Sequence, residues 1–326
     1  MHAPLPAEGR LPGFDGATGW LNTEPLTAEG LRGNVVLVEF WTYTCINWLR
    51  TLPYVRAWAD TYRDRGLVVV GVHTPEFPFE QDVDNVRRAA GELRVSYPVV
   101  LDSDYAIWRA FANRYWPAIY LADARGQIRH HQFGEGGYDD CERGVQQLLR
   151  EAGVEGVGDD LVSVEPEGVE AQADWTNVRS SETYLGYAQG QGFASRSGEA
   201  FGAPAAYEVP ETVMPNQWAL GGEWTIDSRA SVLEGAEGRL VFRFHARDAH
   251  LVMGPGAPGA SAPFRLLIDG EPPGADHGLD VDAEGHGTVT EQRLYQLVRQ
   301  RRPIADRTLE LTFLAPGVEA YVFTFG

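Results

Sequence analysis

The sequence contains no lysine, only two cysteines and no long apolar stretch. All 27 basic residues are arginines, which excludes chemistry that needs a lysine amine, such as a Schiff base. Two cysteines allow one bridge at most, between Cys45 and Cys141. No window approaches the roughly 20 apolar residues of a membrane span, and Met1–Trp20 lacks the basic and apolar segments of a signal peptide. The sequence leaves the compartment open: the cytoplasm is the default, and the alternative is that a membrane part sits on another chain or was left out of this one.

The charge balance is acidic, with a net charge of −19 and a pI near 4.8. Such a field repels phosphate, so we expect no nucleic-acid partner and no binding to an anionic membrane surface. The 326 residues, 44% of them apolar, suit two soluble globular domains. The histidines show no metal-ligand spacing, and we expect no metal or other cofactor.

Residues 1–153 are predicted to form an α/β domain, of which 1–33 is an N-terminal extension. Asn34–Trp41 and Gly66–Val72 are short, β-branched and apolar, which is typical of strands buried on both faces. A helix interrupted by Pro53 is expected between them. Further predicted elements are a helix over Glu80–Leu93, a strand over Pro98–Leu101, a helix capped by Asp102 or Ser103, a hairpin of Ala118–Ala122 and Ile128–Phe133, and a closing helix opened by a capping box of Asp139 and Glu142.

Residues 154–182 are rich in Gly, Val and acid, and we interpret them as a linker. From residue 183 to 326 the pattern changes to short alternating runs separated by turn residues, such as Arg239–His245 and Thr308–Phe313. Strands at this spacing, without helical patterns, favour an all-β sandwich or jelly roll.

Cys45 is the candidate nucleophile, because it follows a buried strand and opens a helix. The unpaired amides and the dipole at a helix N-terminus stabilise a thiolate, and cysteines in such places have pKa values of about 3.5–7.5. A thiolate is the attacking species in disulfide exchange. A small cysteine packed at a strand end is the simpler alternative.

The segment Phe40–Trp48 reads FWTYTCINW and resembles the thioredoxin active site, in the FWTYxCINC form of the DipZ and TlpA-like thiol–disulfide proteins. The resemblance extends over nearly the whole chain. It implies a thioredoxin fold with Glu39 as a buried proton acceptor and Pro53 as the helix-kinking proline. It also implies a cis Trp116–Pro117 bond that faces Cys45, and a second domain similar to carbohydrate-binding modules.

Trp48 departs from this pattern, because it stands where the resolving cysteine belongs. Indole has no thiol and cannot release the product from a mixed disulfide, so dithiol catalysis at positions 45 and 48 is excluded. We expect a thioredoxin-family oxidoreductase that acts, at best, as a monothiol through Cys45, with Glu39 and Pro117 shaping the site. Protein thiols and disulfides would be its partners.

Other routes for Cys45 stay open. Oxidation by peroxide is one, since Thr42 and Cys45 match a peroxiredoxin core, but Val38 replaces the proline of that motif. Cys141 could resolve an intermediate, although a structural role is favoured. Trp48 either lines a groove for a partner peptide or fills the space of a lost cysteine. The aromatic residues expected along that groove are Trp41, Tyr43, Trp48 and Trp116.

The second domain offers weaker patterns. Asp280–Glu291 has partial calcium-loop spacing, but a solvated acidic turn fits it better. Five aromatics could supply platforms for a glycan, or could belong to the core: Trp175, Tyr184, Tyr187, Trp218 and Trp224. A redox-inactive module that binds protein or glycan is therefore the rival function. Because larger relatives carry a membrane electron-transfer domain and are extracytoplasmic, a separate membrane electron donor is a further candidate partner.

Overall fold

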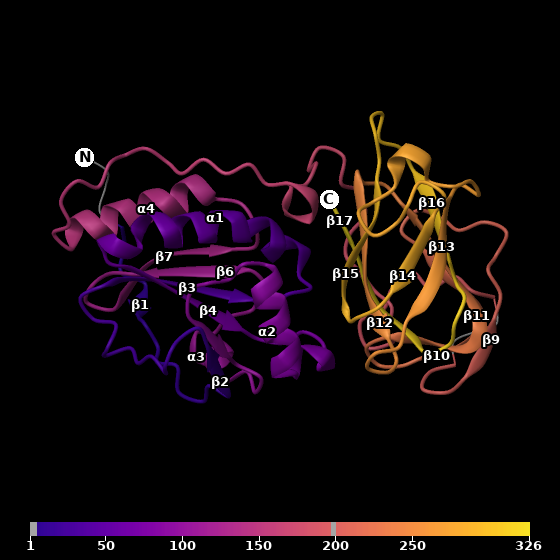
Figure 1. The fold of residues 1–326 in the computed structure, drawn as a ribbon, viewed down its shortest axis with the longest axis horizontal. Helices are drawn as coiled ribbons and strands as arrows, with labels where there is room; N and C mark the ends of the chain where they lie inside the picture. Colours follow the sequence, from indigo (N-terminus) through magenta and orange to yellow (C-terminus); the bar gives the residue numbers. More distant parts are fainter. Residues whose placement is uncertain (1–4, 197–199) are drawn as a thin grey trace. The chain divides into compact units, whose positions relative to one another are not determined.

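The computed structural model describes residues 5–196 and 200–326, which form two compact units, Met1–Ala171 and Gln172–Gly326 (Figure 1). The division falls inside the segment 154–182 expected as a linker. Within the described residues, no helix combines the length and the apolar character needed to cross a bilayer.

The first unit is built on a seven-stranded mixed sheet with the order β1-β7-β6-β3-β4-β5-β2. The central strands β3, β4 and β5 run parallel, and β6 runs antiparallel to β3. This arrangement is that of a thioredoxin fold, as expected. The strands are β1 (Gly9–Arg10), β2 (Gly19–Leu21), β3 (Val35–Trp41), β4 (Leu67–His73), β5 (Val99–Leu101), β6 (Ala118–Ala122) and β7 (Gln127–Phe133).

Helices cover both faces of this sheet. Figure 1 shows α1 and α4 over one face, while α3 packs with Val36, Val38 and Phe40 on the other. Since strand side chains alternate, Leu37, Glu39 and Trp41 point towards α1 and α4. The helices are α1 (Ile46–Tyr62), α2 (Val83–Glu92), α3 (Ala106–Ala110) and α4 (Tyr138–Glu151), with short 3₁₀ turns η1 (Arg63–Arg65), η2 (Pro78–Gln81) and η3 (Gly168–Glu170).

The expected helix over Glu80–Leu93 is divided in the structure. Its first residues belong to the 3₁₀ turn η2, and α2 begins only at Val83. The Asp82 side chain accepts the N–H of Asp84 at 2.8 Å and so caps α2. Glu80 is therefore not a surface residue of an amphipathic helix but a buried one, only 1% exposed.

The predicted capping box of α4 is wrong. The N-cap residue is Gly137, in the left-handed conformation with φ 63°, and not Asp139. Glu142 does not reach back to the helix start but lies inside the unit, where it accepts hydrogen bonds from Trp58 Nε1 at 3.0 Å and Tyr62 Oη at 2.6 Å. A buried carboxylate needs such donors, and α1 supplies both of them.

The second unit is all-β, as expected, and takes the form of one curled antiparallel sheet of ten strands. The path β14-β13-β16-β11-β17-β12-β15 is extended by β10, β9 and β8 at its sides. Strand β11 joins the two parts of the sheet, because Ser231 and Val232 pair with β17 whereas Gly238–Phe244 pair with β16. The strands are β8 (Thr183–Tyr184), β9 (Ala205–Tyr207), β10 (Trp218–Ile226), β11 (Ser231–Phe244), β12 (Asp248–Pro255), β13 (Ala262–Ile268), β14 (His286–Val289), β15 (Arg293–Arg299), β16 (Arg307–Phe313) and β17 (Val318–Phe325), with a 3₁₀ turn η4 (Gly274–Asp276).

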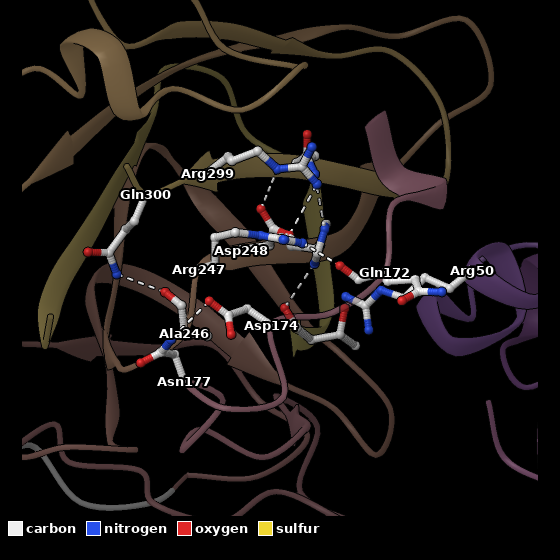
Figure 2. Close-up of polar contacts among 12 residues, drawn as sticks. Arg50, Gln172, Asp174, Asn177, Ala246, Arg247, Asp248, Arg299 and Gln300 are labelled. Atoms are coloured by element: carbon white, nitrogen blue, oxygen red, sulfur yellow. Dashed lines mark hydrogen bonds and ion pairs between the residues drawn. The ribbon is translucent and has the colours of Figure 1, made fainter. Parts of the chain in front are cut away.

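A buried carboxylate ties several strand ends of this unit together (Figure 2). Asp248 is 1% exposed and lies between Arg299, at 2.6 Å, and Arg247, also at 2.6 Å. The two guanidinium groups lower the pKa of Asp248, despite its burial. Arg247 also donates to the carbonyl of Gln172, which fixes the first residue of the unit.

Candidate active site

Cys45 lies between the end of β3 and the start of α1. Trp41 ends the strand, the buried turn Thr42–Thr44 follows, and Cys45 is the N-cap residue of α1 with extended backbone angles (φ −74°, ψ 111°). Its side chain is half-buried. The thiol Sγ lies 3.8 Å from the carbonyl oxygen of Trp116, and the Trp116–Pro117 bond is cis. Cys45 and Pro117 are thus brought together, 72 positions apart in sequence.

Trp48 lies on the first turn of α1 and is fully buried. Its indole stacks on Trp41, with ring centroids 4.3 Å apart and planes inclined by 22°. Its Nε1 donates a hydrogen bond to Glu39 Oε2 at 3.3 Å. The Trp48 side chain is therefore packed and hydrogen-bonded within the unit, and it has no exposed surface.

Glu39 is fully buried on the central strand β3. Tyr97 donates a short hydrogen bond to its Oε1, and Trp48 donates to its Oε2. Burial raises the pKa of Glu39 from 4.5 to about 7, while these two hydrogen bonds act in the opposite direction. The carboxyl group therefore changes its protonation state near neutral pH.

The aromatic residues expected along a groove divide into two groups. Trp41 and Trp48 are fully buried and Tyr43 is only 5% exposed, so the expectation that they contact a partner peptide is not met. Trp116 is half-buried. Its indole donates a hydrogen bond to the carbonyl of Thr74 at 3.1 Å, and its own carbonyl contacts Cys45 Sγ. Of these four aromatic residues, Trp116 is therefore the one that both contacts the thiol and has exposed surface.

Two exposed aromatic residues beside this site were missed by the sequence analysis. Tyr115 is 51% exposed and Phe133 is 41% exposed, and their ring centroids lie 5.0 Å apart. Tyr115 directly precedes Trp116, and the N–H of Gly134 donates to the carbonyl of Pro117 at 2.9 Å. Their pairing depends on contact between β6 and β7, and the sequence contained no periodic pattern that could have indicated it.

Cys141 does not fit the role of a resolving cysteine. It is fully buried on α4, with Sγ 3.6 Å from His130 Nε2. Burial raises the pKa of its thiol from 9.0 to about 12, so it carries no thiolate at neutral pH. Neither cysteine forms a disulfide within the residues that the structure describes.

A buried ion pair lies next to the site. Arg50 on α1 is 1% exposed, and its Nη1 contacts Glu135 Oε1 at 3.0 Å. Glu135 follows Gly134, so the pair ties the active-site helix to the turn beside Pro117. Burial raises the pKa of Glu135, and the nearby guanidinium opposes this rise.

In the second unit, the acidic residues with calcium-loop spacing are engaged in hydrogen bonds. Asp280 accepts from Arg293 Nη2 at 2.7 Å and from the N–H of Gln296 at 2.7 Å. Asp282 accepts two backbone N–H groups of its own turn. No group of three or more potential metal ligands occurs among residues 5–196 and 200–326. The segment 280–285 is thus a hydrogen-bonded acidic turn leading into β14.

The five aromatic residues considered for glycan binding differ in their exposure. Trp218 and Trp224 are 2% and 0% exposed and belong to the core, so they cannot serve as platforms. Tyr184 is half-buried, whereas Trp175 and Tyr187 are 62% and 45% exposed.

Two family models match the chain. Residues 8–147 match the redoxin model, and residues 180–326 match a model described as a thioredoxin-like C-terminal domain. The fold and the cysteine at the helix N-terminus define the same class, that of thioredoxin-like redox proteins.

Curated relatives narrow the assignment. The chain is 37% identical over 142 residues to the thiol-disulfide oxidoreductase YkuV of Bacillus subtilis, covering 43% of this chain and 95% of YkuV. It is 35% identical over 329 residues to protein DipZ of Mycobacterium tuberculosis, covering 99% of this chain and 44% of DipZ. The protein belongs to the thioredoxin-like thiol–disulfide oxidoreductase family. It spans less than half the length of DipZ.

One solved structure is also similar to part of the chain. A solution structure of a thioredoxin-like protein in the oxidized form is 36% identical and covers 44% of this chain and 96% of its own, with a TM-score of 0.41.

Proposed function

We propose that the protein is a monothiol disulfide-exchange protein that acts through Cys45. The Cys45 thiolate attacks one sulfur of a partner disulfide, a new Cys45–partner S–S bond forms, and the partner's other sulfur leaves as a thiolate. An external thiol then attacks the mixed disulfide, takes over the partner's sulfur and returns Cys45 to its thiolate. No net oxidation occurs in this pair of exchanges.

The observation that carries this proposal is the contrast between positions 45 and 48. Cys45 is half-buried at a helix N-terminus, whereas Trp48 is fully buried and engaged with Glu39. A helix N-terminus favours a thiolate. The buried indole leaves the second exchange step to a thiol from outside.

Glu39 takes a different role in this proposal from that of a proton acceptor for a resolving thiol. Its two oxygens accept from Tyr97 and Trp48. Glu39 therefore holds Trp48 in place under Cys45, and it is a positioning residue for the site.

We propose a polypeptide as the substrate, rather than a small disulfide. Tyr115 and Phe133 expose apolar surface next to Trp116, whose carbonyl contacts Cys45. Exposed aromatic clusters mark binding surfaces, and a small disulfide has no groups to cover this one.

The experiment is a titration of the reduced full chain with glutathione disulfide, followed by intact-mass measurement and peptide mapping. One glutathione per chain, located on Cys45, is expected, and dithiothreitol should remove it. Cys45→Ser should take up none, whereas Cys141→Ala should behave as the parent chain. Absence of the adduct at neutral pH, with the fold intact, would count against the proposal.

A binding module without redox activity is the second candidate. Two observations favour this candidate. Trp48 is packed against Trp41, and the exposed Tyr115–Phe133 pair could bind a partner without any exchange chemistry. In that case Cys45→Ser would retain full affinity for a captured protein partner. The monothiol proposal instead requires that capture is lost when Cys45 is replaced.

A further inference from the structure

The turn that delivers Cys45 is held from below by a buried carboxylate. Thr44, the residue before Cys45, is 2% exposed, and its Oγ1 donates to Glu80 Oε1 at 2.6 Å. The other oxygen of Glu80 accepts the N–H groups of Glu76 at 2.6 Å and Phe77 at 2.9 Å. Three donors therefore converge on a side chain that is 1% exposed.

This cluster joins two segments that are far apart in sequence. The donors from Glu76 and Phe77 belong to the loop after β4, and Thr44 belongs to the turn after β3. A buried carboxyl group is costly unless donors satisfy it, so the hydrogen bond from Thr44 stabilises the contact between the two segments. Thr44 directly precedes Cys45, the N-cap residue of α1, so a shift of the Thr44 side chain would also shift Cys45.

The opposite wall of the site is held separately. Trp116 Nε1 donates to the carbonyl of Thr74, and Thr74 Oγ1 donates to Asp102 Oδ2 at 3.1 Å. Asp102 is itself buried and accepts the N–H of Ile107 at 2.9 Å. Each side of the Cys45–Trp116 contact thus has its own buried carboxyl group.

We propose that Glu80 is a positioning residue for Cys45, acting through the hydroxyl of Thr44. It keeps the turn Thr42–Thr44 in the shape that places the thiol at the N-terminus of α1, against the carbonyl of Trp116. The inference rests on the proposed reactivity of Cys45, and it adds Glu80, which lies outside the segment Phe40–Trp48 around the cysteine.

The test uses Thr44→Val in the full chain, because valine keeps the shape of threonine and removes only the donor. The rate of Cys45 alkylation by iodoacetamide is measured against pH. If the thiol no longer lies at the helix N-terminus, the midpoint of the profile should rise towards the value of about 8.5 of an unperturbed cysteine. At pH values well below both midpoints, a rise of one pH unit makes alkylation about tenfold slower.

Thr51→Val is the matched control. Thr51 is equally buried, at 1% exposure, and its hydroxyl donates to the carbonyl of Asn47 at 2.9 Å within α1. It should lower stability without moving the midpoint. A merely structural role of Thr44 would give the same result as this control, and a Thr44→Val profile identical to the parent's overturns the proposal.

Glu80→Gln and the double variant complete a cycle. If Glu80 acts through Thr44, the double variant should alkylate no more slowly than Glu80→Gln alone, and additive losses would contradict the inference. Should Glu80→Gln fail to fold, Thr44→Val decides the matter. Alkylation of Cys45 needs no disulfide partner, so it tests the role of Glu80 independently of the proposed function. A parent chain that is alkylated but never forms a mixed disulfide would refute the proposed function alone.

Discussion

The indole N–H of Trp48 donates a hydrogen bond of 3.3 Å to the buried carboxyl of Glu39. A side chain three residues after Cys45 is thus hydrogen-bonded to a buried group that titrates. Trp48 also stacks on Trp41 and has no exposed surface, so its removal should be felt both in stability and in reactivity.

Trp48→Cys should restore dithiol chemistry, because a thiol three residues after Cys45 lies one helical turn away. We expect this variant to reduce insulin disulfides in the presence of dithiothreitol faster than the parent chain. The lost packing should lower the free energy of unfolding by about 3–5 kcal/mol, as measured in urea.

Trp58→Cys provides the control for this gain. Trp58 is also a fully buried tryptophan of α1, hydrogen-bonded to a carboxylate, but it lies thirteen residues after Cys45. It should lose comparable stability and gain no activity. Equal activity of the two variants would mean that the new thiol at position 48 is not what resolves the mixed disulfide.

Glu39 should make stability fall as pH rises from about 4.5 to about 7. Its pKa in the folded state lies above its ordinary value of 4.5, so the folded state binds the proton more tightly than the unfolded state. The contribution of Glu39 to stability is then fully present below pH 4.5, decreases through the window and is lost above it. A shift of this size corresponds to about 3 kcal/mol.

Other buried groups also titrate, so the comparison that isolates Glu39 is with Glu39→Gln. Urea unfolding at several pH values should show that the stability difference, parent minus variant, declines between pH 4.5 and 7. A flat difference would show that the folded state does not raise the pKa of Glu39.

Arg50→Met should destabilise the first unit by about 3–5 kcal/mol, because it leaves the Glu135 carboxylate buried without its cation. Arg63→Met removes an ion pair with Asp60 whose side chains are 59% and 72% exposed, and should change stability by less than about 1 kcal/mol. Thermal and urea unfolding would measure both. Similar losses in the two variants would mean that burial of the Arg50–Glu135 pair has no energetic consequence.

The double replacement Tyr115→Ser with Phe133→Ser should slow mixed-disulfide formation with a protein disulfide. A loss of about 1.4 kcal/mol of contact energy corresponds to about tenfold. The rate with glutathione disulfide should not change, since Cys45 is untouched. Val83→Ser, at a residue that is 38% exposed, serves as the control for removing apolar surface elsewhere on the unit. Equal slowing with both disulfides would argue against a docking role for the two aromatics.

Sequence patterns predicted the frame of the site well. The strand over Asn34–Trp41, the hairpin from Ala118 to Phe133 and the position of Cys45 before a helix all follow from local periodicity or turn residues, which act over a few positions. The approach of Trp116 to Cys45 came from the resemblance to thioredoxins, and the structure shows it.

The polar partners could not be predicted in this way. Tyr97 meets Glu39 across 58 positions, and Glu80 meets Thr44 across 36. Such contacts depend on how segments far apart in the sequence pack together. The residues around a glutamate in a polar stretch do not show whether its side chain becomes buried or exposed. The fate of Trp48, a groove residue or a filler, was open for the same reason, and its complete burial favours the filler.

The burial of Glu142 determines where a fragment of the first unit should end. Besides its two partners on α1, Glu142 accepts the N–H of Val162 at 3.0 Å, and Glu170 contacts Arg56 at 2.7 Å. A fragment that stops where α4 ends would lose both contacts and uncover a carboxylate in its interior. A fragment of the first unit should therefore extend to Ala171, since a shorter one would lose stability through these contacts and not through any change at Cys45.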